Sequence, residues 1–199
     1  MNGDLPAPDT NDHTPGDPGV WFFIIADMTM FAIFFLIFTV GRHQAPELYR
    51  SSQAHLDVRL GLANTLILMT SGACMAKATI VARTRAAAKT RQYILAALGV
   101  GALFGVSKVI EYRAKFEAGI AINTNEFFGY YFAFTGIHLL HWIVGCIILI
   151  ALVRRLNGPA VSDDTVTWIE SGAIYWHMVD LLWVMLFAMI YLFPAGAGA

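Results

Sequence analysis

Charged residues are scarce in this chain. Only 14% of its 199 residues are Asp, Glu, Lys or Arg, whereas 57% are hydrophobic. An average soluble domain has about 25% charged residues. A shortage of charge on this scale is typical of a protein whose surface is covered by lipid. The net charge of −1 and the lack of a basic block give no reason to expect binding to nucleic acid.

Cysteine is also rare, and the start of the chain lacks basic residues. Cys74 and Cys146 lie in apolar runs without a Cys or His at ligand spacing, which argues against a disulfide framework and a zinc site. Residues 1–18 contain four Asp, four Pro and no Lys or Arg. Secretory signals and mitochondrial transit peptides both need basic residues. We therefore expect a disordered tail over residues 1–18, followed by a hydrophobic run that is retained as a membrane span.

Long hydrophobic runs are what the chain has in abundance. A helix needs about 20 apolar residues to cross the hydrocarbon layer, and five runs reach that length. They are Val20–Val40, Leu60–Ala82, Tyr93–Tyr112, Phe127–Val153 and Ile169–Phe193. The sequence predicts an all-α integral membrane protein with one five-helix domain over residues 19–194 and a short tail over 195–199. Aromatic residues near the run ends are expected to anchor at the membrane interface, namely Trp21, Tyr93, Tyr130, Tyr131, Trp168 and Tyr191.

The basic loops predict the orientation. The loop between the second and third runs contains Arg83, Arg85, Lys89 and Arg91 and no acid. Positive loops stay in the cytoplasm, so we expect a cytoplasmic N-terminus and, after five crossings, an external C-terminus.

The first and third predicted spans contain charged residues, which are costly inside a membrane and usually have partners. Asp27, in the first span, has no basic residue within one turn, so its partner must come from another helix or another protein. It is either a proton-handling or interface carboxyl, or an acid hydrogen-bonded for packing. Lys108 and Glu111 are three residues apart on one helix face, near a span end where Lys can extend to the interface. We favour an ion pair over a transport role.

Histidines mark the fourth and fifth spans. His138 and His141 in TGIHLLH share a helix face and could share a metal, although hydrogen bonding to lipid or other helices is favoured. In the fifth span, Glu170, His177 and Asp180 fall within about 80° around the helix. That polar stripe suggests proton relay, lipid headgroup binding or a network that fixes helix register, and we favour the last. Small-residue steps, Gly101 with Gly105 and Gly72 with Ala76, indicate close helix packing.

Together these segments resemble subunit III of the haem-copper oxidases, in order from about Trp21 to Leu192. Glu170 followed by AIYWHMVDLLW resembles the family's closing E-x-x-x-x-Y-W-H-x-V-D-x-x-W signature. TGIHLLH resembles its T-G-x-H-x-x-H element, NTLILMTSG from Asn64 resembles its N-T-x-x-L-x-x-S-G helix, and Glu111 with Tyr112 matches an E-Y helix end. The five spans resemble the last five of the seven helices in larger members. The resemblance implies that another chain would have to supply the missing wall of the lipid-filled cleft found in those members.

The resemblance implies an accessory subunit that binds no haem and no copper, in a prokaryotic plasma membrane. Haem and copper are expected in the partner catalytic subunit I, beside subunit II, and phospholipids are expected as ligands. Asp27 stands where many oxidase subunits carry Glu, and would face the catalytic partner. The other expected polar contacts with lipid or neighbouring helices are Asn64, Lys108, Glu111, His138, His141, Glu170, His177 and Asp180.

Three alternatives stay open from the sequence. Aspartate at position 27 and the five-span form are similar to the subunit-III-like proteins that accompany nitric oxide reductases. A small proton-coupled carrier could use Asp27, Lys108 and Glu111, although a carrier more often shows internal repeats or broken helices. An independent b-type cytochrome could use His138, His141 and His177.

Overall fold

The computed structural model describes residues 15–158 and 160–192, and every regular element in these ranges is a helix. Five helices are long and apolar enough to span a membrane, as predicted. They are α1 (Pro18–Gln44), α3 (Val58–Arg83), α4 (Ala87–Glu117), α5 (Glu126–Arg155) and α6 (Asp163–Phe187), the last extended by a π-helical turn, η1 (Ala188–Leu192). Most of the predicted N-terminal tail and all of the C-terminal one lie outside the described residues.

Each helical span, with η1 counted as part of the last one, is longer than the hydrophobic run that predicted it. Helix α4 starts at Ala87 and ends at Glu117, whereas the apolar run covers Tyr93–Tyr112. Hydropathy detects only the part of a helix that crosses hydrocarbon, and the polar turns beyond it remain helical in the headgroup region. The short helix α2 (Pro46–Gln53) is not predicted by hydropathy, because it is brief and polar on one side.

Side-chain caps set where four of the spans begin. Asp17, Asp57, Asn125 and Ser162 each accept a hydrogen bond from a backbone N–H in the first turn of α1, α3, α5 and α6. Asp17 accepts from Gly19 at 2.7 Å and is followed by Pro18, whose fixed φ suits the first helical position. These caps satisfy N–H groups that have no partner within the helix.

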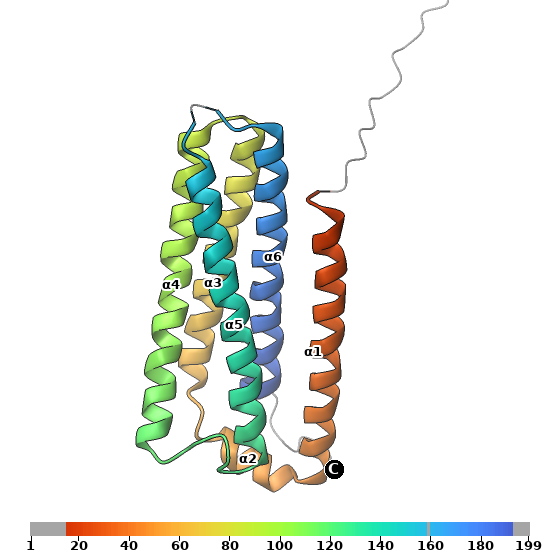
Figure 1. Cartoon of the computed structure of the whole chain (residues 1–199). Coiled ribbons are helices and arrows are strands. Elements are labelled where there is room, and N and C mark those ends of the chain that lie inside the picture. Colours follow the sequence, from red (N-terminus) through yellow and green to blue (C-terminus); the bar gives the residue numbers. More distant parts are fainter. Residues whose placement is uncertain (1–14, 159, 193–199) are drawn as a thin grey trace, which may run out of the picture.

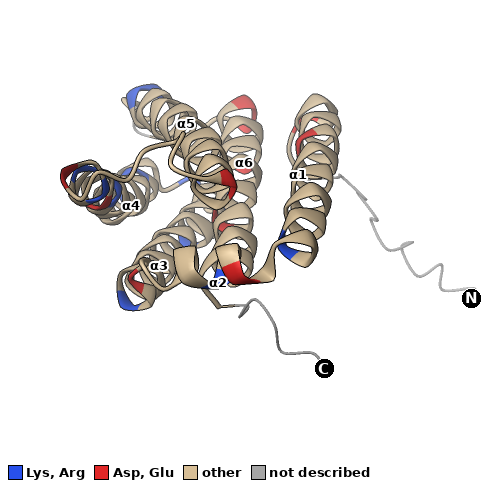
Figure 2. Ribbon diagram, turned by 90° about the horizontal axis from the view of Figure 1, so that it is seen from below, with Lys and Arg blue, Asp and Glu red and all other residues tan. Residues whose placement is uncertain are grey.

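Helices α3, α4, α5 and α6 form a bundle, with α1 on its outer side (Figure 1). Helix α6 is central: 61% of its most hydrophobic window is buried, against 17% for α1. Seen along the bundle, α3 and α1 lie on different sides of α6 (Figure 2). Helix α1 is therefore the span with most of its surface available to lipid or to a partner.

Aromatic rings connect α1 to the rest of the molecule. Phe34 stacks on Phe134 of α5 with ring centroids 5.6 Å apart, and Phe38 contacts Phe127 of α5 at 6.0 Å. Phe38 also packs edge-on against Tyr49 of α2 at 5.2 Å. Burial and the neighbouring Glu126 carboxylate raise the pKa of Tyr49, so its hydroxyl stays protonated and donates to Glu126 at 3.3 Å. Helices α1 and α5 thus contact each other through large aromatic side chains, which keep the two backbones apart.

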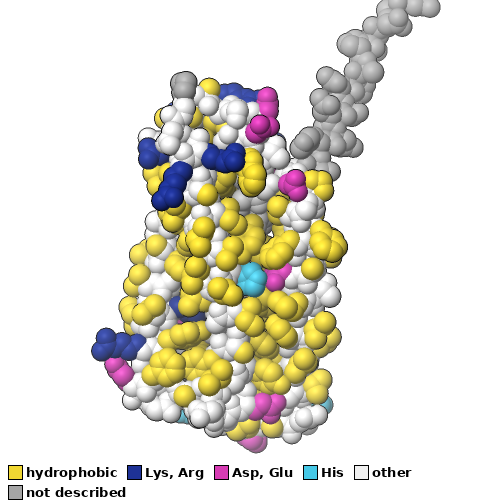
Figure 3. Space-filling model, viewed as in Figure 1, with side chains coloured by type: hydrophobic (Ala, Val, Ile, Leu, Met, Phe, Trp, Pro, Cys, Tyr) yellow, Lys and Arg dark blue, Asp and Glu magenta, His cyan; other side chains and the backbone are white. Residues whose placement is uncertain are grey.

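Two loops meet at the end of the bundle where α1 begins (Figure 1). Arg85, in the turn between α3 and α4, has a positive φ of 61°. Its guanidinium donates to the carbonyl of Val161 at 3.0 Å and pairs with Asp163, in the segment that leads into α6. Hydrophobic side chains cover most of the face between the two ends of the molecule, with much of the Lys and Arg near this end (Figure 3). This distribution is that of a membrane-spanning bundle.

Glycines of α4 and α5 accommodate indole rings. A Cβ atom at Gly101 would lie 2.8 Å from Trp176, and one at Gly145 would lie 2.7 Å from the same ring. Trp176 is fully buried and donates from Nε1 to Ser71 at 3.1 Å. The expected small-residue step of α4 therefore makes room for a Trp from α6.

The first prediction concerns this packing. Gly145→Ala forces a methyl group against Trp176, which is held by its hydrogen bond, so overpacking should destabilise the chain by about 1–3 kcal/mol. Gly136→Ala is the matched control, because nothing lies within 4 Å of a Cβ at this site in the same helix. Thermal unfolding of the purified chain in detergent, followed by circular dichroism, should show a lower Tm for the first variant only. Equal Tm values for the two variants would contradict this account.

Candidate functional site

The polar side chains predicted inside the membrane do not converge on one centre. They form separate pairs and networks between different helices, each described below. Within residues 15–158 and 160–192, no three His, Cys, Asp or Glu side chains come together as a metal-binding group would require.

Asp27 of α1 pairs with His141 of α5. The carboxylate Oδ1 lies 3.1 Å from the imidazole Nε2, and Asp27 is only 6% exposed. The other imidazole nitrogen, Nδ1, is 2.8 Å from the carbonyl of Ile137. The partner that Asp27 needs thus comes from another helix of the same chain.

This geometry places one proton between the two side chains. A carbonyl can only accept, so Nδ1 of His141 carries a hydrogen and donates to Ile137. A close contact between Nε2 and Oδ1 then needs a second hydrogen, either on the imidazole as an ion pair or on the carboxyl as a neutral pair. The second oxygen of Asp27, Oδ2, is buried and has no hydrogen-bond partner among the described residues. The pair can therefore keep its contact with the shared proton on either side chain, whereas loss of that proton would leave two acceptors facing each other.

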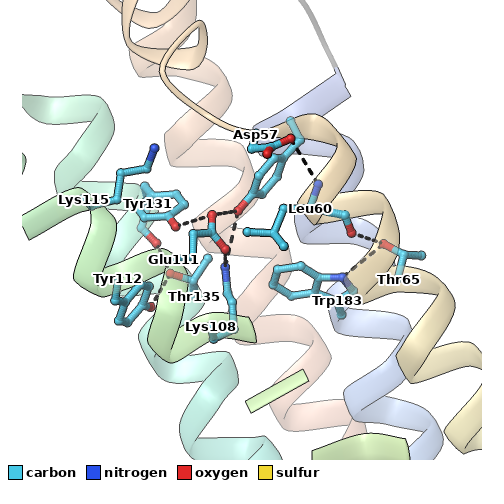
Figure 4. Close-up of polar contacts among 12 residues, drawn as sticks. Asp57, Leu60, Thr65, Lys108, Glu111, Tyr112, Lys115, Tyr131, Thr135 and Trp183 are labelled. Carbon is cyan, nitrogen blue, oxygen red and sulfur yellow. Dashed lines mark hydrogen bonds and ion pairs between the residues drawn. The ribbon is translucent and has the colours of Figure 1, made fainter. Parts of the chain in front are cut away.

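Lys108 and Glu111 form an ion pair at the core of a buried network (Figure 4). Nζ of Lys108 lies 2.7 Å from Oε2 of Glu111 and 4.7 Å from the centre of the Trp183 ring. Oε1 of Glu111 accepts from the hydroxyls of Tyr131 at 2.7 Å and Tyr191 at 2.6 Å. The network joins α4, α5 and η1, so it fixes the relative register of these elements.

Two expectations about this region are wrong. Lys108 does not extend to the interface, because its side chain is fully buried beneath aromatic rings. Tyr131 and Tyr191 are not interfacial anchors either. They are 0% and 3% exposed, and their hydroxyls donate hydrogen bonds to Glu111. Burial is possible because each polar atom of the pair has a partner inside the bundle.

His138 and His141 point to different partners although they share a helix face. Nε2 of His138 is 3.0 Å from the carbonyl of Val179 in α6, and its ring is fully buried between Phe104 and Trp183. His141 faces α1 instead. This packing leaves no space for a haem macrocycle at His138, which disfavours the cytochrome interpretation.

Glu170 lies apart from His177 and Asp180. Its carboxylate pairs with Arg83 of α3 at 2.9 Å and accepts from the backbone N–H of Gly16 at 3.2 Å. Glu170 thereby connects the start of α1, the end of α3 and α6. His177 and Asp180, 3.5 Å apart, form their own pair two turns further along α6. A shared direction around a helix did not bring the three residues into one network, because two turns separate them by about 10 Å.

Asn64 is fully buried in α3, and neither atom of its amide has a hydrogen-bond partner among the described residues.

The sequence analysis did not identify the partners that lie on other helices, namely Arg83 for Glu170, and Tyr131 with Tyr191 for Glu111. A basic residue at a span end and tyrosines near span ends were the available signals, but they do not specify which helix is opposite.

Comparison with known proteins decides the family. Residues 16–195 match the family model for cytochrome c oxidase subunit III. The chain belongs to this family. Within it, the subunit 3 of Synechocystis sp. is 26% identical over 87% of this chain and 74% of its own length. That of Thermostichus vulcanus is 25% identical over 87% of this chain and 85% of its own.

Another subunit III relative is part of a longer protein. The haem-copper oxidase subunit I+III of Aeropyrum pernix is 26% identical over 87% of this chain, which covers 22% of that protein. This chain is thus a multi-pass membrane protein of the subunit III family, a family of haem-copper oxidase subunits. The polar pairs described above are features of a subunit III bundle.

The buried ion pair generates the second prediction. Glu111→Leu removes the counter-ion of the Lys108 ammonium and the acceptor of two tyrosine hydroxyls, so it should cost about 3–5 kcal/mol. Lys108→Met should cost less, because Glu111 keeps both hydroxyl donors. The double variant should be more stable than Glu111→Leu alone, since no charge stays unpaired. Unfolding of the purified variants in detergent measures the order, and simple additivity of the two single changes would argue against the coupled network.

Proposed function

We propose that the chain is an accessory, cofactor-free subunit of a terminal oxidase that uses cytochrome c or quinol. The observation that supports it is the subunit III match over residues 16–195, nearly the whole chain. Its role is to pack against the catalytic subunit, stabilise it during turnover and support its proton uptake. The arrangement of polar residues agrees with a supporting role, because the pairs hold helices together and do not converge around a substrate.

The proposed partners are the catalytic subunit I and subunit II, with haem and copper in the catalytic partner and phospholipids around the bundle. The Aeropyrum pernix relative supports direct association with subunit I, because its name joins subunits I and III in one protein. The proposed location is a prokaryotic plasma membrane with the N-terminus in the cytoplasm. The dense basic loop at Arg83–Arg91 supports that orientation.

We assign to Asp27 the contact with the catalytic partner and the support of its proton uptake. It lies on the span with the least buried surface, and its buried second oxygen has no partner within the described chain. Its proton is shared with His141, so a change in the surroundings of α1 would shift that proton. Proton supply to the partner and contact with the partner are both consistent with this position.

Two features favour a second candidate, an accessory role beside a nitric oxide reductase. Asp at position 27 and the five-span form resemble that branch of the family. The two candidates predict the same fold and the same type of partner. They differ in the gas that the complex reduces.

A mild-detergent pull-down of the chain from its native membrane tests the proposal. We expect a large multi-helix subunit and haem in the eluate, with the haem lost from this chain after the complex is dissociated. Oxygen and nitric oxide consumption by the eluate would then distinguish the two candidates. A chain recovered alone and colourless would refute both, and a chain that keeps haem alone would support a cytochrome.

Asp27 generates the third prediction. Asp27→Ala should leave the chain folded but lower the recovery of the complex or shorten its working life, since His141 loses its partner at the exposed span. Asp27→Asn is the control, because it keeps the size and a hydrogen bond to His141 but not the proton. Activity decay that is faster in both variants indicates proton handling, whereas a defect in Asp27→Ala alone indicates packing. Unchanged recovery and lifetime in both would contradict the assignment.

A further inference from the structure

Helix α6 lies between α3 and α1 in the view along the bundle (Figure 2), and it exposes a single stripe of side chains. Within residues 169–187, the exposed side chains are those of His177, Leu181, Val184 and Met185. A hollow of about 320 Å³ runs along this stripe between α3 and α6. Gly72 in its lining makes room for the Asp180 carboxylate, since a Cβ there would clash with Oδ2. The small side chains of Ala73 and Ala76 in the same lining allow another helix to approach closely.

A polar pair lies in the same hollow. Nδ1 of His177 is 3.5 Å from Oδ2 of Asp180, and the His177 side chain is 45% exposed. Asp180 is only 9% exposed, yet its Oδ1 has no hydrogen-bond partner among the described residues. His177 is the fifteenth of the 30 residues in the span Asp163–Leu192, so the pair lies near the middle of that span.

Lipid is a poor neighbour for such a pair. Acyl chains at mid-depth offer no hydrogen bond, and ionisable side chains in spans almost always face protein or water. With Nδ1–H directed to Asp180, a neutral imidazole presents a lone pair at Nε2 and accepts a hydrogen bond. The complementary group is a hydroxyl, amide or indole donor on an adjacent helix.

A second copy of this chain fits less well than a different protein. Two copies related by a two-fold axis would place two Asp180–His177 pairs opposite each other, acceptor against acceptor. A two-fold dimer through this face therefore lacks the donor that His177 needs, whereas a helix of different sequence can supply it.

We propose that the α3–α6 groove, with His177 at its centre, is the docking site for a transmembrane helix of the catalytic subunit. The small residues admit the helix backbone, and Asp180 orients His177 toward its donor. This inference rests on the proposed function, since it assigns a face to the association proposed above.

Site-specific photo-crosslinking in the assembled complex tests the docking face. Benzoylphenylalanine replaces Ala73 in the groove or, as the matched control, Ala102, which is exposed near the middle of α4 on another face. Native membranes are irradiated and the products identified by mass spectrometry. We expect a crosslink to the catalytic subunit from position 73 and none from position 102.

The outcomes separate this inference from the proposed function. If the unmodified chain recovers no catalytic subunit, the proposed function fails and the inference fails with it. If the complex is recovered but position 73 crosslinks only lipid or a second copy of this chain, the docking face is wrong while the function stands. Crosslinks of equal yield from positions 73 and 102 would also overturn the assignment.

Substitution of the histidine provides an independent readout. His177→Leu should weaken association with the catalytic subunit about threefold, the effect of an average interhelical hydrogen bond in a membrane. His177→Gln, which keeps an acceptor, should restore association. The unfolding temperature of the isolated chain measures what each variant costs by leaving the buried Asp180 without its histidine, and only a loss of association beyond that cost is assigned to docking. Weaker association in neither variant, or equally in both, would argue against the hydrogen bond.

Discussion

The absence of water from the bilayer core is the constraint on which this structure depends. A polar side chain there must find its partner inside the protein. Glu111 meets the requirement with Lys108 from its own helix and with hydroxyls from α5 and η1. Trp176 meets it through Ser71 of α3. The bonds between different helices join neighbouring elements at a defined height, so the helices α3 to α6 share one register. Helix α1 has fewer such bonds and is attached mainly through phenylalanine rings, with one polar pair to α5.

The sequence predicted those features that depend on the residues of a single helix. Run lengths gave the five spans, and the three-residue spacing gave the ion pair of Lys108 with Glu111. Contacts across helices could not be predicted, because they depend on how each helix is rotated against its neighbours. Tyr131 was expected at the interface for that reason, although it is buried. Helix α2 was missed because eight residues with polar positions resemble a loop in a hydropathy profile.

A shared helix face also proved a weak guide to a shared site. His138 and His141 are one turn apart, yet one bonds α6 and the other α1. Residues on one face can contact different helices when that face lies at the junction of two neighbours. The histidine spacing that suggested a metal or a haem is thus explained by helix packing. The same reasoning applies to Glu170, which bonds Arg83 at one end of the bundle while His177 lies near the middle of its span.

The bundle therefore contains two kinds of polar group. One kind stabilises the folded chain, and the other is available to stabilise the assembled complex. Lys108 and Glu111 have their partners within the chain, so their effect belongs to folding. Asp27 and Asp180 are each held by a histidine, yet one oxygen of each lacks a partner in the described chain. Leaving a buried oxygen unpaired costs stability, and a protein tolerates that cost where another interaction needs the group. Asp27 lies between α1 and α5 and Asp180 lies in the α3–α6 groove, so each belongs to a different face of the bundle. Substitution of Lys108 or Glu111 should accordingly change the stability of the isolated chain. Substitution of Asp27 or Asp180 should change the stability of the assembled complex.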